Sequence, residues 1–211
     1  RNFPLAPENT AAAGTPLNWN HNFQNNPYWV LENNKNTFYK DRVIGNLNFA
    51  YDFTKDLIAT FKYGRDQFAL QTTSNKAIGT NSFQEGFFQV VNRNVNETNI
   101  EFLLSYNTDL SEDFTFGLSA GANSMKRVYT RLLGQANQLE LPNLYTLENV
   151  KSGVTPILSN WNREQRINSV YGFGSIGYRD YLFLEFTARN DWASVLPTQN
   201  NSFFYPSVSL S

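Results

Sequence analysis

The clearest pattern in the sequence is a two-residue alternation of apolar and polar side chains. Between Arg42 and Phe53, one set of alternate positions is apolar and the other is mostly polar; the apolar set is Val43, Leu47, Phe49, Tyr51 and Phe53. A period of two is that of a β-strand with one face against an apolar phase and the other in water. We therefore predict a strand here, and helix-period patterns are scarce in the rest of the chain.

Six further segments repeat this alternation and form hairpins with one another. The predicted strands cover residues 57–66, 98–108, 114–123, 167–178, 181–190 and 203–211. Tight turns at 54–56, 110–113 and 179–180 close three hairpins. Within 167–178 two sets compete for the apolar face, and we assign it to Val170, Gly172, Gly174, Ile176 and Tyr178 rather than to Tyr171, Phe173, Ser175 and Gly177.

Strand length indicates which kind of all-β protein this is. About 11 residues at roughly 3.3 Å each, tilted by about 40°, rise ~27 Å, which matches the ~25 Å apolar band of an outer-membrane barrel. Strands of soluble proteins usually have about 5–6 residues. The predicted fold is therefore all-β: an antiparallel transmembrane β-barrel fragment of about seven long strands.

The connections alternate between short and long. Long polar segments are predicted at about 67–97, 125–166 and 191–202, rich in Asn, Gln, Ser and Thr. Outer-membrane barrels have short periplasmic turns and long extracellular loops, so this asymmetry predicts the orientation of the chain.

The membrane also restricts where charged residues lie. Lys or Arg on the lipid face at the bilayer midplane costs ~2–4 kcal/mol, so Lys62 and Glu101 are predicted to face the lumen. Arg65 shares the alternate positions of Phe61 and Tyr63. It lies at the predicted strand end, where the cost falls to ~0–1 kcal/mol, and we expect it to mark the membrane rim.

Composition agrees with a wall that has one lipid face and one wet face. Aromatic residues make up 16% of the chain, with 18 Phe and 11 Tyr, although the mean hydropathy is −0.46. A net charge of −1 without clustered Lys and Arg argues against a nucleic-acid partner. The absence of cysteine excludes disulfides and thiolate metal sites. No apolar run reaches the ~20 residues of a membrane-spanning helix.

The ends of the sequence predict a part of a larger protein. The chain begins at Arg1 and stops at Ser211 inside an alternating segment. Seven strands leave two unpaired edges, which are costly in lipid. We expect residues 1–211 to be part of one β-barrel domain, with the remaining strands elsewhere.

Several segments carry a resemblance to a known family. Residues 178–185 (YRDYLFLE), 188–197 (ARNDWASVLP) and 200–209 (NNSFFYPSVS) resemble a characteristic part of SusC/RagA transporters, and residues 26–37 (NPYWVLENNKNT) with 42–47 (RVIGNL) are also similar. The resemblance covers most of the chain and is weakest over 67–97 and 125–166.

The resemblance implies a function, which the strand pattern does not. Members of the family are outer-membrane proteins of Bacteroidetes-type bacteria, with a 22-stranded barrel around an N-terminal plug. They are opened through the TonB complex, are capped by a SusD-like lipoprotein lid, and import oligosaccharides or peptides. We expect no enzymatic activity, no cofactor and no metal. No plug or TonB-contacting segment is recognisable in this sequence. The resemblance therefore implies that residues 1–211 are part of one TonB-dependent receptor-type β-barrel domain, with the plug domain and remaining strands elsewhere.

Several residues are candidate ligand contacts. Arg189, Asp191 and Trp192 could bind a sugar or a peptide terminus; we favour instead an ion pair between Arg189 and Asp191 across strands, bracing the wall, with Trp192 at the membrane interface. Trp29 and Trp161, together with Trp19 and Tyr28, lie outside the clear strands, and each could stack on a sugar ring or anchor a loop.

Two functions of other classes remain as alternatives. One is a soluble or secreted all-β glycan-binding module, suggested by the aromatic and Asn-rich loops. The other is a barrel hydrolase, which needs a Ser with a nearby His. His21 is the only histidine, and it has no spaced Ser, Asp or Glu partner, so we expect a structural or solvent role for it.

Overall fold

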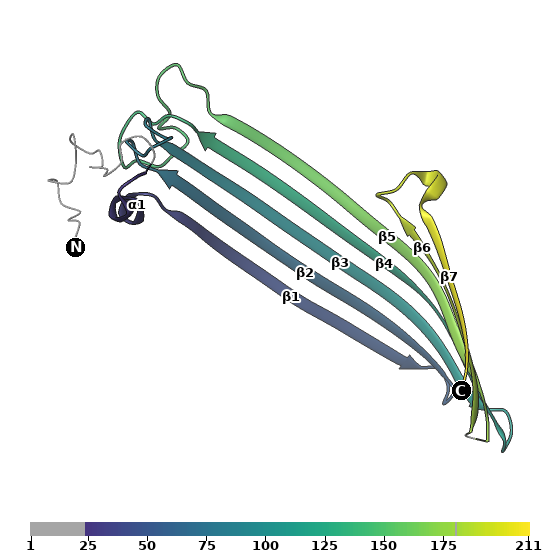
Figure 1. Cartoon of the computed structure of the whole chain (residues 1–211). Helices are drawn as coiled ribbons and strands as arrows, with labels where there is room; N and C mark the ends of the chain where they lie inside the picture. The colour runs from purple at the N-terminus through teal and green to yellow at the C-terminus, as the bar shows by residue number, and fades with distance from the viewer. Residues whose placement is uncertain (1–23, 180) are drawn as a thin grey trace. The chain divides into compact units, whose positions relative to one another are not determined.

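The computed structural model describes residues 24–179 and 181–211, and it shows one antiparallel sheet. Its seven strands follow one another in sequence order from β1 to β7 (Figure 1). The strands are β1 (Asn36–Asp52), β2 (Leu57–Lys76), β3 (Phe87–Asp109), β4 (Phe114–Ala136), β5 (Ile157–Tyr178), β6 (Leu182–Ala193) and β7 (Ser202–Leu210). The prediction of an all-β, antiparallel, seven-stranded barrel wall is confirmed.

The chain divides into two compact units, which we name by their connections. The turn unit comprises residues 42–68, 95–129 and 163–211, and it contains the three tight turns. The loop unit comprises, among the described residues, 24–41, 69–94 and 130–162. Strands β1 to β5 contribute residues to both units, whereas β6 and β7 belong to the turn unit alone.

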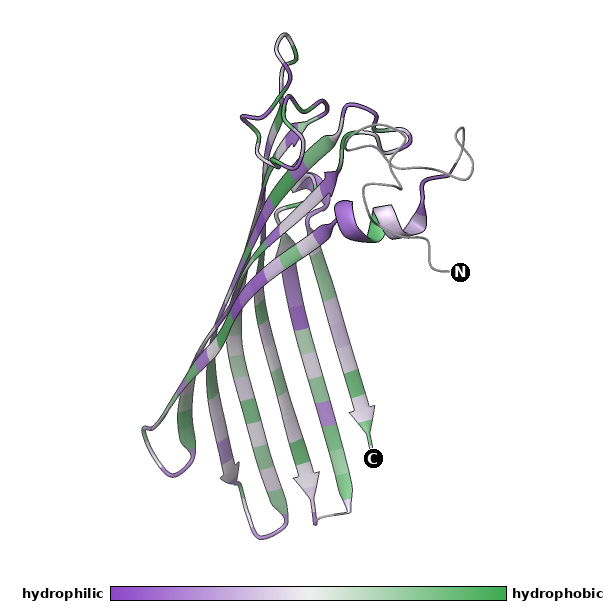
Figure 2. Cartoon of the chain, turned by 90° about the vertical axis from the view of Figure 1, so that its left-hand side faces the viewer, coloured by the Kyte–Doolittle hydropathy of each residue, from purple (hydrophilic) through white to green (hydrophobic). Residues whose placement is uncertain are grey.

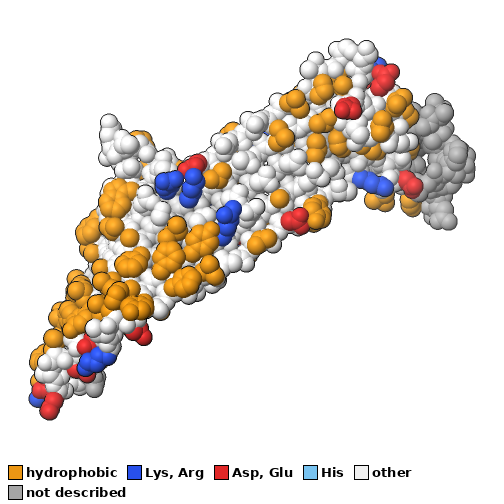
Figure 3. All heavy atoms as spheres, turned by 180° about the vertical axis from the view of Figure 1, so that it is seen from behind, with side chains coloured by type: hydrophobic (Ala, Val, Ile, Leu, Met, Phe, Trp, Pro, Cys, Tyr) orange, Lys and Arg blue, Asp and Glu red, His pale blue; other side chains and the backbone are white. Residues whose placement is uncertain are grey.

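The predicted alternation is present in the strand segments next to the tight turns, and Figure 2 shows bands of contrasting hydropathy along the strands. Large apolar side chains of one series are exposed, among them Phe49 (60%), Phe102 (49%) and Val208 (73%). Figure 3 shows apolar side chains gathered densely in one region of the surface. Such an exposed apolar surface requires an apolar partner phase.

Strand register settles the ambiguous face of β5. Ile176 lies opposite Leu184, and Gly174 lies opposite Phe186. Directly opposed residues of an antiparallel pair share a face, so the assigned set is on the apolar face. Gly174 is required there, because a Cβ atom would lie 2.6 Å from Phe186 Cζ and 2.7 Å from the carbonyl oxygen of Gly117.

Ion pairs and backbone hydrogen bonds fasten the tight turns of the turn unit together. Arg179, at φ +48°, donates through Nε (2.9 Å) and Nη2 (3.2 Å) to the two carboxylate oxygens of Asp113. The backbone N–H of Arg179 also donates to the carbonyl oxygen of Asp113. The backbone N–H of Asn107 donates to the carbonyl oxygen of Asp56. Each turn is thereby attached to its neighbour.

The predicted long loops are largely strand, so their boundaries were wrong. The connections shrink to residues 77–86, 137–156 and 194–201, the last containing the 3-10 helix η2 (Thr198–Asn200). The strand extensions mix polar and apolar side chains on both faces, so they show no alternation. The backbone hydrogen bonds between strands form without it. Short and long connections still alternate.

Arg65 is consequently not at a strand end, because β2 continues to Lys76. Its Nη2 donates to Gln67 Oε1 (3.0 Å) and to Asn96 Oδ1 (3.5 Å). The apolar series of β2 thus becomes polar at Arg65 without ending the strand.

The loop unit has its own small core and one helix that the sequence pattern did not predict. Helix α1 (Pro27–Asn33) is capped by Asn26, whose Oδ1 accepts from the N–H groups of Tyr28 (3.0 Å) and Trp29 (3.4 Å). The buried apolar residues of this unit are Ala77, Val91, Leu133, Ala136 and Leu139. No helix among the described residues has the length and hydropathy needed to cross a membrane.

The connection 137–156 is ordered by polar contacts. The side chain of Asn149, 6% exposed, donates to the carbonyl oxygens of Leu141 (2.8 Å) and Leu144 (2.6 Å) and accepts from the N–H of Leu141 (3.0 Å). Lys151 Nζ lies 2.7 Å from Glu85 Oε2 and so joins this connection to the connection 77–86.

Candidate functional site

The charged residues in the polar series of the turn unit neutralise one another between neighbouring strands. Lys62 of β2 lies 2.9 Å from Glu101 of β3, so these two residues share a face as predicted. Arg42 of β1 makes a forked contact with Asp66 of β2, at 2.9 Å and 2.6 Å. Arg127 Nε donates to Glu97 Oε2 at 2.6 Å. This face is polar but carries little net charge.

Arg189 belongs to the same face, but its pairing differs from the prediction. Its Nε donates to Asp191 Oδ1 at 2.7 Å, two residues along the same strand, so the predicted pairing across strands was wrong. The brace across strands comes instead from Nη2, which donates to Ser169 Oγ of β5 (2.9 Å), and from the Tyr171 ring, 5.5 Å from the guanidinium. Two of the five N–H donors of Arg189 are thus hydrogen-bonded within the wall.

The structure does not bring Trp192 together with Arg189 and Asp191. Trp192 lies opposite Asn168 and Ser202, in the alternate series that carries Phe186 and Ala188. Its side chain is 40% exposed. The three residues are neighbours in sequence but lie on two faces of β6.

The other candidate tryptophans that the structure describes lie in the loop unit. Trp161 is in β5 and is 48% exposed. Trp29 is in α1, and its indole Nε1 is buried without an acceptor among the residues described. Trp19 and His21 lie outside the described residues.

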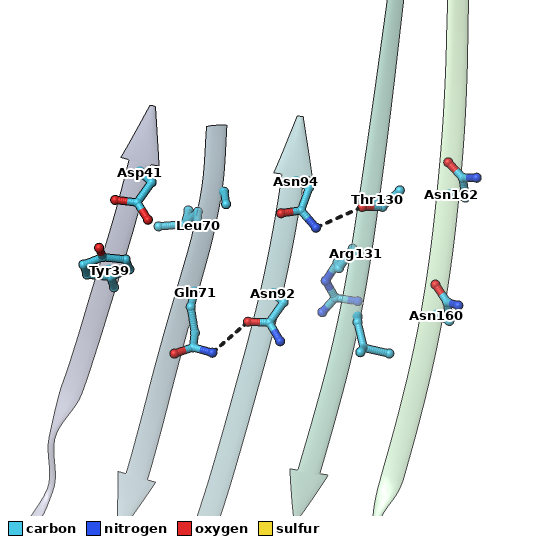
Figure 4. Close-up of a pocket in the computed structure, with 12 residues that line it drawn as sticks. Tyr39, Asp41, Leu70, Gln71, Asn92, Asn94, Thr130, Arg131, Asn160 and Asn162 are labelled. Atoms are coloured by element: carbon cyan, nitrogen blue, oxygen red, sulfur yellow. Dashed lines mark hydrogen bonds between the residues drawn. The ribbon is translucent and has the colours of Figure 1, made fainter. Parts of the chain in front are cut away.

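The loop unit contains a polar hollow of about 710 Å³, which Figure 4 shows in close-up. It extends over five strands, and most of its side chains are amides or hydroxyls. The lining residues that occupy one alternate series are Tyr39, Asp41, Ala69, Gln71, Asn92, Asn94, Thr130, Leu132, Asn160 and Asn162. Sequence reasoning placed most of these in loops; the repeated Asn at 92 and 94, and again at 160 and 162, was the available signal of a polar strand face.

The chemistry of this hollow is that of neutral hydrogen bonding. Gln71 donates to Asn92 (3.0 Å) and Asn94 donates to Thr130 (3.4 Å), as the dashed lines in Figure 4 show. Amide groups can exchange such partners for hydroxyl or peptide groups of a ligand. No group of three or more potential metal ligands occurs in the described residues.

Solved structures with a similar fold are RagAB proteins. The chain aligns with "Structure of the RagAB peptide transporter" at a TM-score of 0.77 and 17% identity, over 88% of this chain and 21% of that one. The RagAB peptide importer in its 'open-open' and 'closed-closed' states gives TM-scores of 0.81 and 0.76, each at 16% identity and with the same coverage.

Comparisons of the sequence alone identify no relative of the chain. No protein-family profile matches the chain, and no curated protein matches it. The chain spans about a fifth of the length of the RagAB chains. The resemblance to the SusC/RagA family is thus confirmed at the level of fold: the chain folds like one part of the RagAB proteins.

Proposed function

We propose that this chain is a wall segment of a TonB-dependent nutrient transporter in a bacterial outer membrane. The observation that carries the proposal is the division of the turn unit into an exposed apolar face and an ion-paired polar face, because these are the faces that lipid and a water-filled lumen require. The fold likeness to the RagAB proteins supports it.

The proposed transporter imports peptides or oligosaccharides together with a SusD-like lipoprotein lid and has no enzymatic role. The solved proteins of similar fold are described as a peptide transporter or importer, which favours peptides as cargo. Residues 1–211 are then part of a single receptor-type barrel domain, and energy coupling to TonB depends on other parts of that protein.

The absence of cysteine makes the two faces testable with single substitutions. Thr187 and Ala188 are adjacent, exposed and close to cysteine in size; Thr187 lies in the polar series and Ala188 in the apolar one. In isolated outer membranes, a membrane-impermeant sulfonated maleimide should label Thr187→Cys and spare Ala188→Cys. A lipid-soluble maleimide should label both.

The same two cysteine variants also test whether the polar face lines the transport path. In cells that express the natural gene, a bulky maleimide adduct at Thr187→Cys should reduce uptake of a fluorescent peptide, and Ala188→Cys, treated identically, is the matched control. Equal labelling of both cysteines by the impermeant reagent would contradict the membrane assignment and favour a soluble glycan-binding module.

A further inference from the structure

Two arginines of the loop unit lack the ion pairs that several charged residues of the turn unit form. Neither Arg93 nor Arg131 forms an ion pair or a side-chain hydrogen bond in the part of the chain that the structure describes, and both are only partly exposed. Arg42, Lys62 and Arg127, by contrast, each contact a carboxylate on a neighbouring strand.

Strand register places these two arginines directly opposite each other. Hydrogen bonds from Asn94 to Thr130 and from Gln89 to Gln135 align β3 with β4. This register sets Arg93 against Arg131, with Cβ atoms about 4.5–5.5 Å apart by the usual geometry of such pairs.

The row continues with an apolar residue on one side and an aromatic residue on the other. The bond from Gln71 to Asn92 sets Leu70 of β2 opposite Arg93. The bond from Ser124 to Asn168 aligns β4 with β5 and sets Trp161 opposite Arg131. Leu70, Arg93, Arg131 and Trp161 therefore form one row across four strands, in the series that alternates with the amides of the hollow.

An unneutralised pair of this kind is unfavourable in the absence of a ligand. Like charges directly opposite on neighbouring strands destabilise a sheet. Two guanidinium groups at directly opposed positions can present N–H donors in parallel, which match the two oxygens of a carboxylate. An anion held between them would remove the repulsion and satisfy the donors.

From this row we infer that the loop unit binds the carboxylate of a peptide between Arg93 and Arg131, with apolar side chains of the peptide against Leu70 and Trp161. The inference rests on the proposed function and gives its substrate a chemical class. An apolar residue at one end of the row fits an amino-acid side chain better than it fits the hydroxyl-covered ring of an acidic sugar.

Equilibrium binding to the natural gene product in detergent tests this without requiring transport. The probe is an N-terminally fluorescent heptapeptide of neutral, partly apolar residues, made with a free C-terminal carboxylate and as its C-terminal amide. The wild type should bind the acid at least roughly tenfold more tightly than the amide. A C-terminal amide peptide with one glutamate inside its sequence should also bind more tightly than the neutral amide if a side-chain carboxylate fits the same site.

The variants assign that preference to the row. Arg93→Gln and Arg131→Gln should each bring acid and amide to nearly equal affinity, while leaving the affinity for the amide unchanged. Arg131→Lys, which keeps the charge but loses the fork, should retain part of the preference. Arg65→Gln is the matched control, because it removes the same charge from the alternate series of β2.

Unchanged amide binding also shows that each variant is folded. A wild type that does not distinguish acid from amide, or a preference that survives in both glutamine variants, would overturn the inference. The inference would also be overturned if the wild type bound trigalacturonate tightly, lost that binding in Arg131→Gln, and showed no preference between the acid and amide peptides. None of these results affects the cysteine-labelling test of the proposed function.

Discussion

The turn unit and the loop unit share strands β1 to β5, yet the alternation in the sequence predicts these strands only in the turn unit. In the turn unit, β3 alternates Ile100, Phe102 and Leu104 with a second set in which only Leu103 is apolar. In the loop unit the same strand reads Asn92-Arg93-Asn94, which is polar on both faces. Alternation therefore reports what lies against each face, not whether a strand is present.

The two units also differ in what holds them together. The turn unit exposes its apolar series and pairs its charges, so its stability depends on the phase that surrounds it. The loop unit depends on a small apolar core and on polar contacts such as those of Asn149. Substitutions matched across the two units should therefore have very different effects.

The largest contrast is expected for one substitution made on the same series in both units. Leu104 in the turn unit and Leu132 in the loop unit are 37% and 51% exposed. Leu104→Arg should lower the free energy of unfolding by about 2–4 kcal/mol, because it places a charge in the apolar band. Leu132→Arg should change it by less than about 1 kcal/mol. Reversible urea unfolding of the natural gene product in lipid vesicles measures both.

This comparison is decisive because residue type and series are the same in both variants. If Leu132→Arg costs as much as Leu104→Arg, the apolar band extends into the loop unit. If neither is costly, the exposed apolar face of the turn unit does not lie in lipid.

A smaller and local effect is expected for Asn149→Ala. The substitution removes three hydrogen bonds to the backbone of the connection 137–156, a loss of roughly 1–3 kcal/mol for a buried polar group. Limited proteolysis should cut this connection at least roughly tenfold faster, while unfolding of the turn unit is unchanged. Asn137→Ala is the control, since Asn137 is exposed and only accepts a bond from Gln135. A large shift in global unfolding would show that the two units do not respond separately.

The parts of the fold that the sequence predicted are those where a face has a single environment. All seven strands, the tight turns and the assignment of Gly174 to the apolar face follow from alternation. The strand extensions did not follow from it, because a strand with water on both faces has no period of two. Helix α1 has only seven residues, too few for a helical period to be visible beside the Asn26 cap.

The candidate contacts could likewise be predicted only where one environment restricts the side chain. Lys62 and Glu101 could be placed on one face because the membrane penalises the alternative strongly. The partner of Arg189 could not be found, since a residue two positions along the strand and residues opposite on the next strand are all within its reach. The Arg93 and Arg131 row depends on the register of two strand segments that alternation did not reveal.

The smallest expected effect is electrostatic and lies in the loop unit. A hydrogen bond from Lys151 to Glu85, with the charge of that carboxylate, raises the pKa of Lys151 above its ordinary value of 10.5, and the charge of Glu140 adds to the shift. Because the folded-state pKa is the higher one, this contact stabilises the folded loop fully below the ordinary lysine pKa and is lost as pH rises through the raised value. NMR titration of ¹³C-methylated lysines, assigned with Lys151→Arg, should show the pKa of Lys151 falling in Glu85→Gln. The fall should be smaller in Glu140→Gln, because Glu140 acts only through its charge. A pKa of Lys151 that does not respond to Glu85→Gln would mean that the connections 77–86 and 137–156 are not joined by this ion pair in solution.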